Sequence, residues 1–200
     1  VWMDRELFSG SPNISTMMNQ DIQGLTAEEL AFINGPVTEL CEMIDDWEIQ
    51  RTKQIPEDVW TFVKDNQFLG MIIPKDYGGL GLSAIGHSAV IEKIASVSAT
   101  MAITIMVPNS LGPAELLLHY GTDEQKERYL AKLATGEEMP CFGLTEPTAG
   151  SDAGGLTSEG VVFKDESDQL QIRFNWDKRW ITLSGISTVV GLAFLLKDPD

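Results

Sequence analysis

The chain has 200 residues, of which 43% are hydrophobic, so it can bury a core in one large domain or in two small ones. Its 14 Lys and Arg against 30 Asp and Glu give a formal net charge of -16, which excludes nucleic acid as a partner and excludes a polybasic membrane anchor. Its longest apolar runs fall far short of the roughly 20 residues that span a bilayer.

The cysteines and histidines are few and widely spaced. Cys41 and Cys141 form no CxxC pair, so neither a disulfide framework nor a zinc site is indicated, and a reducing cytoplasm is favoured. We interpret His87 and His119 as partly buried helix residues with satisfied ring nitrogens, and we expect no metal. Because the sequence begins with a valine and stops directly after an apolar run, we expect it to be a fragment of a longer protein.

Residues 1–24 are polar without a sustained period, so we interpret them as an extension over a surface. From Thr26 onward the pattern is helical: Thr26 and Glu29 form a capping box, and apolar residues then recur at spacings of three and four. Gly35 and Pro36 are expected to split this helix. Caps and stops predict further helices from residue 56, over 83–97, over 110–120 and from 122 to just before Gly136.

Gly79, Gly81 and Ala84 match GxGxxA after an apolar run, which is the loosest form of the dinucleotide-binding fingerprint. Three residues, 75–77, separate the run from the glycines. We see no clear second strand about 20 residues on that ends in an acidic residue, as that fold requires. A plain loop followed by a helix cap at Ser83 is therefore predicted.

The hydrophobic period shortens after Met139. Strands are predicted at 142–145, 160–164, 170–176, 179–183 and 188–196. Helices followed by strands indicate an α+β fold with an antiparallel sheet, in which residues 26–134 are mostly helix and 140–196 mostly strand. The expected divisions are an extension over 1–24, a helical domain over 25–138 and a truncated β domain over 139–200.

The stretch CFGLTEPTAGSDAGG, residues 141–155, concentrates the groups suited to a ligand. Gly150, Gly154 and Gly155 lie close to Ser151 and Asp152, so backbone N–H groups can approach an anion such as a phosphate without a Cβ in the way. A cofactor site is the hypothesis that this loop supports.

Three groups of residues, LTEP at 144–147, AGSD at 149–152 and WIT at 180–182, resemble the flavin-binding signatures of acyl-CoA dehydrogenases. The resemblance extends over residues 25–200 through shorter segments in the same order: 73–74, 77–79, 109–112, 121–122, 125–126 and 129–130. Residues 1–10 also resemble the region before the helical domain in the long bacterial acyl-CoA dehydrogenases of fatty-acid β-oxidation.

This resemblance implies an N-terminal helical domain, a middle β domain and a C-terminal four-helix domain, with FAD between them. The chain would hold the first and part of the second, and would lack the third. Implied contacts to FAD come from Phe142, Leu144, Thr145, Gly150, Ser151, Trp180 and Thr182. Among these, Gly150 and Ser151 would meet the pyrophosphate, Trp180 would pack against the isoalloxazine and the Thr182 hydroxyl would reach flavin N5. Ser151, Asn109 and Gly112 are the implied substrate contacts.

The reaction implied by the resemblance is the α,β-dehydrogenation of a fatty acyl-CoA to a trans-2-enoyl-CoA, in which a base removes the α proton and the β hydrogen leaves as hydride to flavin N5. The family's base is a carboxylate from the missing domain, so the chain is expected to hold no catalytic residue and to be inactive alone. Electron-transfer flavoprotein is the implied acceptor, and the intact protein is expected to be a cytoplasmic homo-oligomer. Association with the inner membrane through missing segments is left open.

Several alternatives remain at this point. Glu146 is read as a structural carboxylate that accepts backbone N–H groups rather than as a catalytic one. Met101, Ile103 and residues 105–107 suit either core filler or the wall of an acyl channel. Lys178 and Arg179 form the only local basic pair after residue 139, so the CoA phosphates are either solvated or partnered by the missing domain. An acyl-CoA oxidase or a non-catalytic flavin- or acyl-binding scaffold are the alternative functions.

Overall fold

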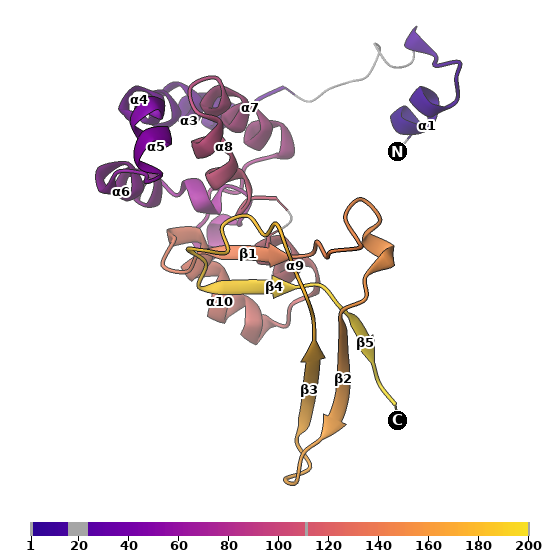
Figure 1. Cartoon of the computed structure of the whole chain (residues 1–200). Coiled ribbons are helices and arrows are strands. Elements are labelled where there is room, and N and C mark those ends of the chain that lie inside the picture. The colour runs from indigo at the N-terminus through magenta and orange to yellow at the C-terminus, as the bar shows by residue number, and fades with distance from the viewer. Residues whose placement is uncertain (1, 16–23, 111, 200) are drawn as a thin grey trace.

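The computed structural model describes residues 2–15, 24–110 and 112–199, with helices up to residue 135 and strands after it (Figure 1). The α-helices are α1 (Trp2–Phe8), α3 (Ala27–Asn34), α4 (Pro36–Met43), α5 (Asp46–Thr52), α6 (Glu57–Asp65), α7 (Ala84–Ala95), α8 (Ala99–Met106), α9 (Pro113–Tyr120) and α10 (Asp123–Thr135). Short 3-10 helices are η1 (Phe68–Gly70), η2 (Lys75–Tyr77) and η3 (Ala153–Gly155). The strands are β1 (Pro140–Gly143), β2 (Glu159–Lys164), β3 (Leu170–Asn175), β4 (Val189–Leu192) and β5 (Leu195–Lys197).

Local capping chemistry sets most of the helix starts. The side chain of Thr26 accepts from the Glu29 N–H while the Glu29 carboxylate accepts from the Thr26 N–H, and Thr122 repeats this capping box at the start of α10. Gly35 separates α3 from α4, as predicted, because Pro36 has no N–H to continue the helical ladder. Ser83 caps α7 through the Gly86 N–H.

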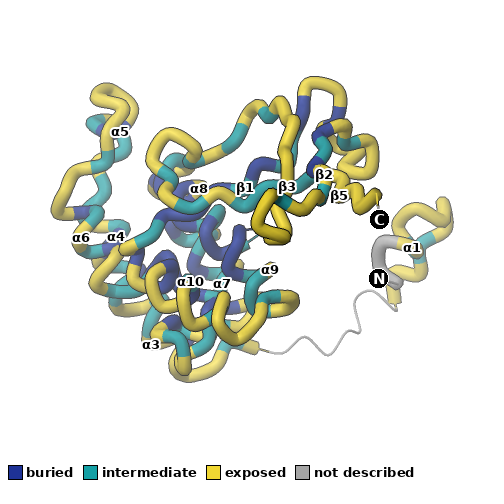
Figure 2. The backbone as a smooth tube through the Cα atoms, turned by 90° about the horizontal axis from the view of Figure 1, so that it is seen from below, coloured by how far each residue is buried: buried dark blue, intermediate teal, exposed yellow. Residues whose placement is uncertain are grey.

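The apolar core lies almost entirely in the helical part, as Figure 2 shows by its dark-blue tube. One cluster joins α4, α6, η1, α7 and α8, and a smaller one joins Ile73 to α9 and α10. The largest fully buried side chains are Phe68, Leu40, Leu69, Met71, Ile73, Ile94, Met101, Ile105, Leu130, Leu133, Val37 and Val59. This core fixes the platform on which the strands lie.

The strands form two small sheets. β1 pairs in parallel with β4, with Phe142 opposite Gly191. β2 is central in the second sheet, antiparallel to β3 and parallel to β5. In Figure 1 the β2–β3 hairpin projects away from the helices. Since β4 and β5 follow each other closely yet belong to different sheets, residues 193 and 194 join the two sheets. Phe194 stands edge-on to Phe174 at this joint, with ring centroids 4.6 Å apart.

The α+β organisation is confirmed, with three corrections to the strands. The sheets are not antiparallel throughout, because the β1–β4 sheet is parallel and the three-stranded sheet is mixed, with only the β2–β3 pair antiparallel. Strand occupies less than half of residues 140–196. Residues 179–183 are not a strand, since Trp180 and Leu183 have φ values of 60° and 66°, which end an extended backbone and fold it into a turn.

The helical part follows its sequence pattern more closely. Gly79 and Gly81 lie in the loop before α7, where their N–H groups donate to the carbonyls of Pro74 and Ile73, so the loop-and-cap interpretation is confirmed. Residues 2–8 form a helix where no regular element was predicted, and residues 16–23 of the predicted extension lie outside the described part. None of the described helices combines the length and apolarity needed to cross a bilayer.

Candidate functional site

The loop after β1 folds back on itself around a buried carboxylate. The Glu146 N–H donates to the Ala149 carbonyl at 2.9 Å, which closes a turn at Pro147. The Glu146 side chain accepts from the Thr157 N–H at 2.7 Å, the Thr157 hydroxyl at 2.8 Å and the Ser158 N–H at 3.0 Å. The structural role predicted for Glu146 is thereby confirmed.

A cation completes the surroundings of this carboxylate. Lys178 Nζ lies 2.7 Å from Glu146 Oε1, and each side chain is only 1% exposed. The Lys178 ammonium, together with the hydrogen bonds from Ser158 and Thr157, holds the pKa of Glu146 far below its usual range. Glu146 therefore stays ionised at any physiological pH.

The same region joins two of the sequence signatures. Lys178 Nζ also donates to the Leu144 carbonyl at 3.0 Å, and the Arg179 N–H donates to the Thr145 carbonyl at 3.0 Å. The LTEP segment and the segment that leads into Trp180 are separated by more than 30 residues in sequence. The structure nevertheless brings them side by side.

A hollow of about 260 Å³ lies beside this junction. Its walls include Cys141 and Gly143 of β1, Val190 of β4 and the side chains of Trp176 and Trp180. Trp180 is 84% exposed, so its ring is free to receive a planar partner. Thr182, two residues on, is also exposed.

The glycine loop is open on its outer side. A Cβ added to Gly150 would meet nothing within 4 Å, and Ser151 is exposed. Neither the Gly150 N–H nor the Ser151 N–H donates to a carbonyl within the described residues. Such free, unobstructed N–H groups fit an anionic ligand.

Not every predicted flavin contact lies at this junction. Phe142 lines a different hollow, together with Leu116 and Leu117 of α9, and its ring packs over Gly191. Alternation along β1 explains this placement, because Gly143 faces the Trp180 hollow and its neighbour Phe142 faces the other side. The Phe142 ring and Trp180 therefore lie at different hollows, and the contact of Phe142 with FAD stays a prediction.

The two predicted substrate contacts in the helical part, Asn109 and Gly112, are buried and take part in the packing and hydrogen bonding of the fold. Asn109 is buried: its Nδ2 donates to the carbonyls of Phe68 and Ile105, and its Oδ1 accepts from the Ile72 N–H. These bonds leave Asn109 committed to the backbone. Gly112 is buried at the start of α9, where an added Cβ would approach the carbonyl oxygens of Val107 and Pro108 to 3.1 Å. Its lack of a side chain serves packing.

The apolar run that begins at Met101 contains both buried and exposed side chains, so core filler and channel wall each describe some of its residues. Met101 and Ile105 are fully buried in the core, whereas Ile103 is 45% exposed on the other side of α8. Residue 103 is thus available to an external ligand and residues 101 and 105 are core filler.

The histidines do not behave alike. His119 is exposed, while the Nε2 atom of His87 is buried and has no hydrogen-bond partner, which contradicts the expected satisfied ring. Burial lowers the pKa of His87. Among the described residues no three His, Cys, Asp or Glu side chains gather closely enough to hold a metal.

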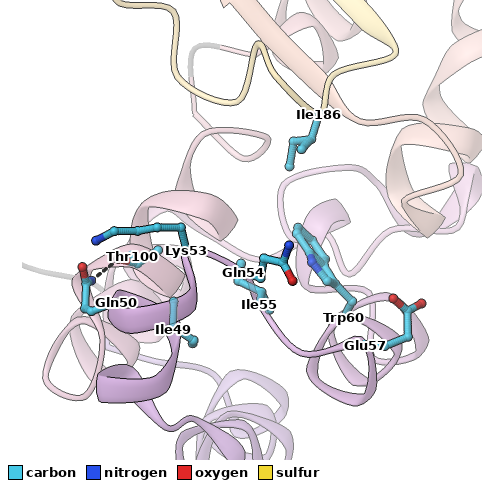
Figure 3. Close-up of a pocket in the computed structure, with 9 residues that line it drawn as sticks. All are labelled: Ile49, Gln50, Lys53, Gln54, Ile55, Glu57, Trp60, Thr100 and Ile186. Carbon is cyan, nitrogen blue, oxygen red and sulfur yellow. Dashed lines mark hydrogen bonds between the residues drawn. The ribbon is translucent and has the colours of Figure 1, made fainter.

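A larger hollow, of about 460 Å³, lies between α5, α6 and the start of α8, with Ile186 from the strand part facing it (Figure 3). Ile49, Ile55 and Trp60 supply apolar walls, and Gln50 Nε2 donates to Thr100 Oγ1 at 2.7 Å on one side. None of the predicted cofactor residues lines it.

Lys178 is the residue that sequence reasoning missed. Its one signal was its position two residues before Trp180 in a strand half poor in Lys and Arg, where it stood out only as half of the local basic pair with Arg179. Its partner, Glu146, lies 32 residues away. No pattern in the nearby sequence predicts an ion pair between residues this far apart.

The comparison with protein families agrees with the arrangement of these residues. The family model described as acyl-CoA dehydrogenase, N-terminal domain, matches residues 24–137, which is more than half of the chain. The chain belongs to the acyl-CoA dehydrogenase family.

Relatives and solved structures support this assignment over a wider range. An acyl-CoA dehydrogenase of Bacillus subtilis is 29% identical over 184 residues, which cover 92% of this chain and 44% of the relative. A 3-(aryl)acrylate reductase of Clostridium sporogenes is 37% identical over 140 residues, or 70% and 36% of the two chains. The butyryl-CoA dehydrogenase structure from Megasphaera elsdenii superposes with a TM-score of 0.73 at 25% identity, covering 86% and 45%. The chain spans less than half the length of each.

Acyl-CoA dehydrogenases are FAD enzymes, and the residues present fit that cofactor. An exposed indole beside a hollow suits a flavin ring, and an open loop with free N–H groups suits a pyrophosphate. In this chain the two features are connected to one carboxylate, because Glu146 shapes the loop and holds the segment before Trp180.

Proposed function

We propose that the protein containing this chain oxidises a fatty acyl-CoA to a trans-2-enoyl-CoA in fatty-acid β-oxidation, with FAD as its cofactor. The observation that carries the proposal is the junction of the LTEP and WIT segments through Lys178 and the Arg179 N–H. Residues that resemble flavin-binding signatures thereby form one surface. Family membership supports the same reaction class.

Each residue of that surface has a distinct task in the proposal. Trp180 packs against the flavin ring, the Thr182 hydroxyl hydrogen-bonds its reactive edge, and the N–H groups of Gly150 and Ser151 bind the pyrophosphate. Leu144 and Thr145 border the ring through the backbone. When bound, FAD supplies the acceptor for the hydride that leaves the β carbon. The protein's own contribution is alignment of that carbon with the ring.

The general base is not Glu146. A base must be able to take a proton from the α carbon, and the pKa of Glu146 is held far below its usual range by Lys178 and by hydrogen bonds. Both Glu146 oxygens are also enclosed by Lys178, Thr157 and Ser158. We propose that a carboxylate outside these 200 residues removes the α proton.

The substrate proposal changes in one respect from the sequence expectation. Ile103, exposed on α8, takes the place of Asn109 as the candidate contact for the acyl chain, since the Asn109 amide is fully engaged. Ser151 remains the candidate near the CoA end of the substrate. We further propose electron-transfer flavoprotein as the electron acceptor and a homo-oligomeric assembly.

An anaerobic titration of the intact, FAD-loaded protein with saturated acyl-CoA of different chain lengths tests the proposal. We expect the oxidised flavin absorbance to bleach and an electron-transfer flavoprotein to reoxidise it. Bleaching followed by fast peroxide release in air would instead indicate an acyl-CoA oxidase. Failure to bleach with any acyl-CoA would contradict the proposal and favour a non-catalytic scaffold.

A reductase is the second candidate, because the relative from Clostridium sporogenes carries that name at 37% identity. The same alignment of a flavin with a Cα–Cβ bond serves the reverse reaction. Pre-reduced protein mixed with an arylacrylate, free or as its CoA ester, separates the two directions. Reoxidation by the arylacrylate without bleaching by saturated acyl-CoA would assign the protein as a reductase.

A further inference from the structure

The buried interior of the strand part includes a pair of charged side chains, Glu146 and Lys178, whereas the core cluster of the helical part is apolar. Among the described residues beyond 138, the buried apolar side chains are Met139, Pro140, Cys141 and Ala149. The Glu146–Lys178 pair is buried alongside them, with each side chain 1% exposed. An ion pair removed from water this completely is retained where its directional bonds specify a geometry.

The bonds of this pair reach both signatures at once. Lys178 Nζ binds the Leu144 carbonyl and Glu146 Oε1, and the next residue donates its N–H to Thr145. We name this set the clasp: the Glu146 and Lys178 side chains, the Arg179 N–H, and the Leu144 and Thr145 carbonyls. Every member of the LTEP stretch from 144 to 146 thus contributes one acceptor to the segment before Trp180.

Trp180 depends on the clasp for its position. Its ring is 84% exposed, so packing within the described residues does little to hold it. Its φ of 60° is unusual for a bulky residue and persists only where neighbouring bonds enforce it. The bonds at residues 178 and 179 lie directly before it and are anchored to the loop that carries Gly150 and Ser151.

We infer that Lys178 and Glu146 are positioning residues of the flavin site, and that their clasp sets the distance and angle between Trp180 and the Leu144–Thr145 backbone. This inference rests on the proposed function in taking FAD as the ligand of that surface. The clasp itself is a property of the protein chain and is measurable without FAD.

Three variants of the intact protein test it: Lys178→Met, Glu146→Gln and the double variant. The exposed pair formed by Lys197 and Glu159 supplies the matched control, as Lys197→Met with Glu159→Gln. Hydrogen exchange of peptides covering residues 176–184 is measured on apoprotein, and FAD affinity and the flavin absorbance spectrum on reconstituted protein.

We expect Lys178→Met to speed exchange at Arg179 and to weaken FAD binding about tenfold, the change for one or two lost hydrogen bonds. The double variant distinguishes a role of the pair in positioning Trp180 from a role in the stability of the fold alone. Because it removes both buried charges, its melting temperature should recover toward the parent value. Its Leu144 carbonyl still lacks a donor, so FAD binding should stay weak and the flavin band should stay shifted.

A double variant that regains parental FAD affinity and spectrum together with stability would overturn the positioning role. Parental exchange at residues 176–184 in Lys178→Met would overturn the clasp itself. An intact parent protein that binds no FAD would contradict the proposed function instead, and with it the assignment of the clasp to a flavin, while the exchange data would still report whether the two segments are held together.

Discussion

The helical part and the strand part of this chain are stabilised in different ways. In the helical part, buried leucine, isoleucine and valine side chains from five helices pack against each other. In the strand part, large apolar side chains on β2, β3 and β5 are left exposed, among them Phe163, Phe174 and Leu196. Among the ion pairs of the described residues, the most buried is the one between Glu146 and Lys178.

This difference indicates what sets the geometry of the proposed flavin surface. Apolar packing is non-directional, so it stabilises a platform without fixing the angle of one backbone segment against another. Hydrogen bonds and ion pairs are directional and do fix such angles. The helical part thus supplies stability, and the polar core of the strand part supplies orientation.

The largest expected effect is a difference between the two parts in how much a leucine-to-alanine substitution lowers the free energy of unfolding. Leu40→Ala in the helical core should lower the free energy of unfolding by about 2 to 5 kcal/mol, because it leaves a cavity where no solvent reaches. Leu196→Ala on β5, where the side chain is 59% exposed, should change it by about 0.5 kcal/mol or less. Urea unfolding of both variants measures the contrast. Equal losses would mean that the strand part has a core of its own.

Low pH should destabilise both parts, because each contains one buried carboxylate whose pKa is lowered by the fold, Glu29 in the helical part and Glu146 in the strand part. Hydrogen bonds from Ser83 and Thr26 lower the pKa of Glu29 from 4.5 to about 2. A group whose pKa is lower in the folded state stabilises the fold above its unfolded pKa, and that stabilisation is lost as pH falls from about 4.5 toward 2. Glu146, with a pKa lowered further, adds to the same slope.

Glu29→Gln should therefore flatten the fall of the urea midpoint between pH 5 and pH 2.5. Glu28→Gln is the control, since Glu28 is its exposed neighbour. A midpoint that falls just as steeply in Glu29→Gln would show that the buried carboxylate of the helical part does not govern acid sensitivity.

An exposed tryptophan in each part offers the next comparison. Trp47 is 78% exposed and Trp180 is 84% exposed, so replacing either by alanine should leave stability nearly unchanged. In the intact protein only Trp180→Ala should weaken FAD binding, by about tenfold or more, because it removes the ring that we propose to pack against the flavin. Fluorescence or absorbance titration with FAD gives both affinities. Parental affinity in Trp180→Ala would remove this residue from the site.

The smallest expected effect lies at Thr182. Loss of its hydroxyl in Thr182→Ala should slow flavin reduction by about two- to tenfold with little change in FAD affinity, as expected for one hydrogen bond of about 0.5 to 1.5 kcal/mol. Thr182→Ser keeps the hydroxyl and should react at close to the parental rate. Stopped-flow reduction by acyl-CoA distinguishes them, and equal rates for the alanine and parent proteins would exclude a contact with the reactive edge.

Features that depend on neighbours in sequence could be predicted. The capping boxes at Thr26 and Thr122 and the break at Gly35 are local chemistry, and each lies where the pattern placed it. The structural role of Glu146 also followed from the turn proline beside it. The hypothesis of a ligand loop at Gly150 and Ser151 agrees with the open surface there.

Features that depend on distant partners could not be predicted. Residues 179–183 have strand-like composition, yet they form a turn because Lys178 and the Arg179 N–H are fastened to residues 144–146. Asn109 carried a family resemblance, but its amide is used by backbone groups up to 41 residues away. Phe142 lies against α9 and over Gly191 of β4, and neither element is a neighbour of β1 in sequence.

The joint at residues 193 and 194 connects the two small sheets along the chain. Phe194 fills the place where Gly160 of β2 has no side chain, so that an added Cβ there would come within 2.5 Å of its ring. The hairpin of β2 and β3 is connected to β1 by an unbroken path: β2 pairs with β5, β4 comes just before β5 along the chain, and β1 pairs in parallel with β4. Because β1 leads directly into residues 144–146, this path of paired strands ends at the backbone that borders the proposed flavin surface.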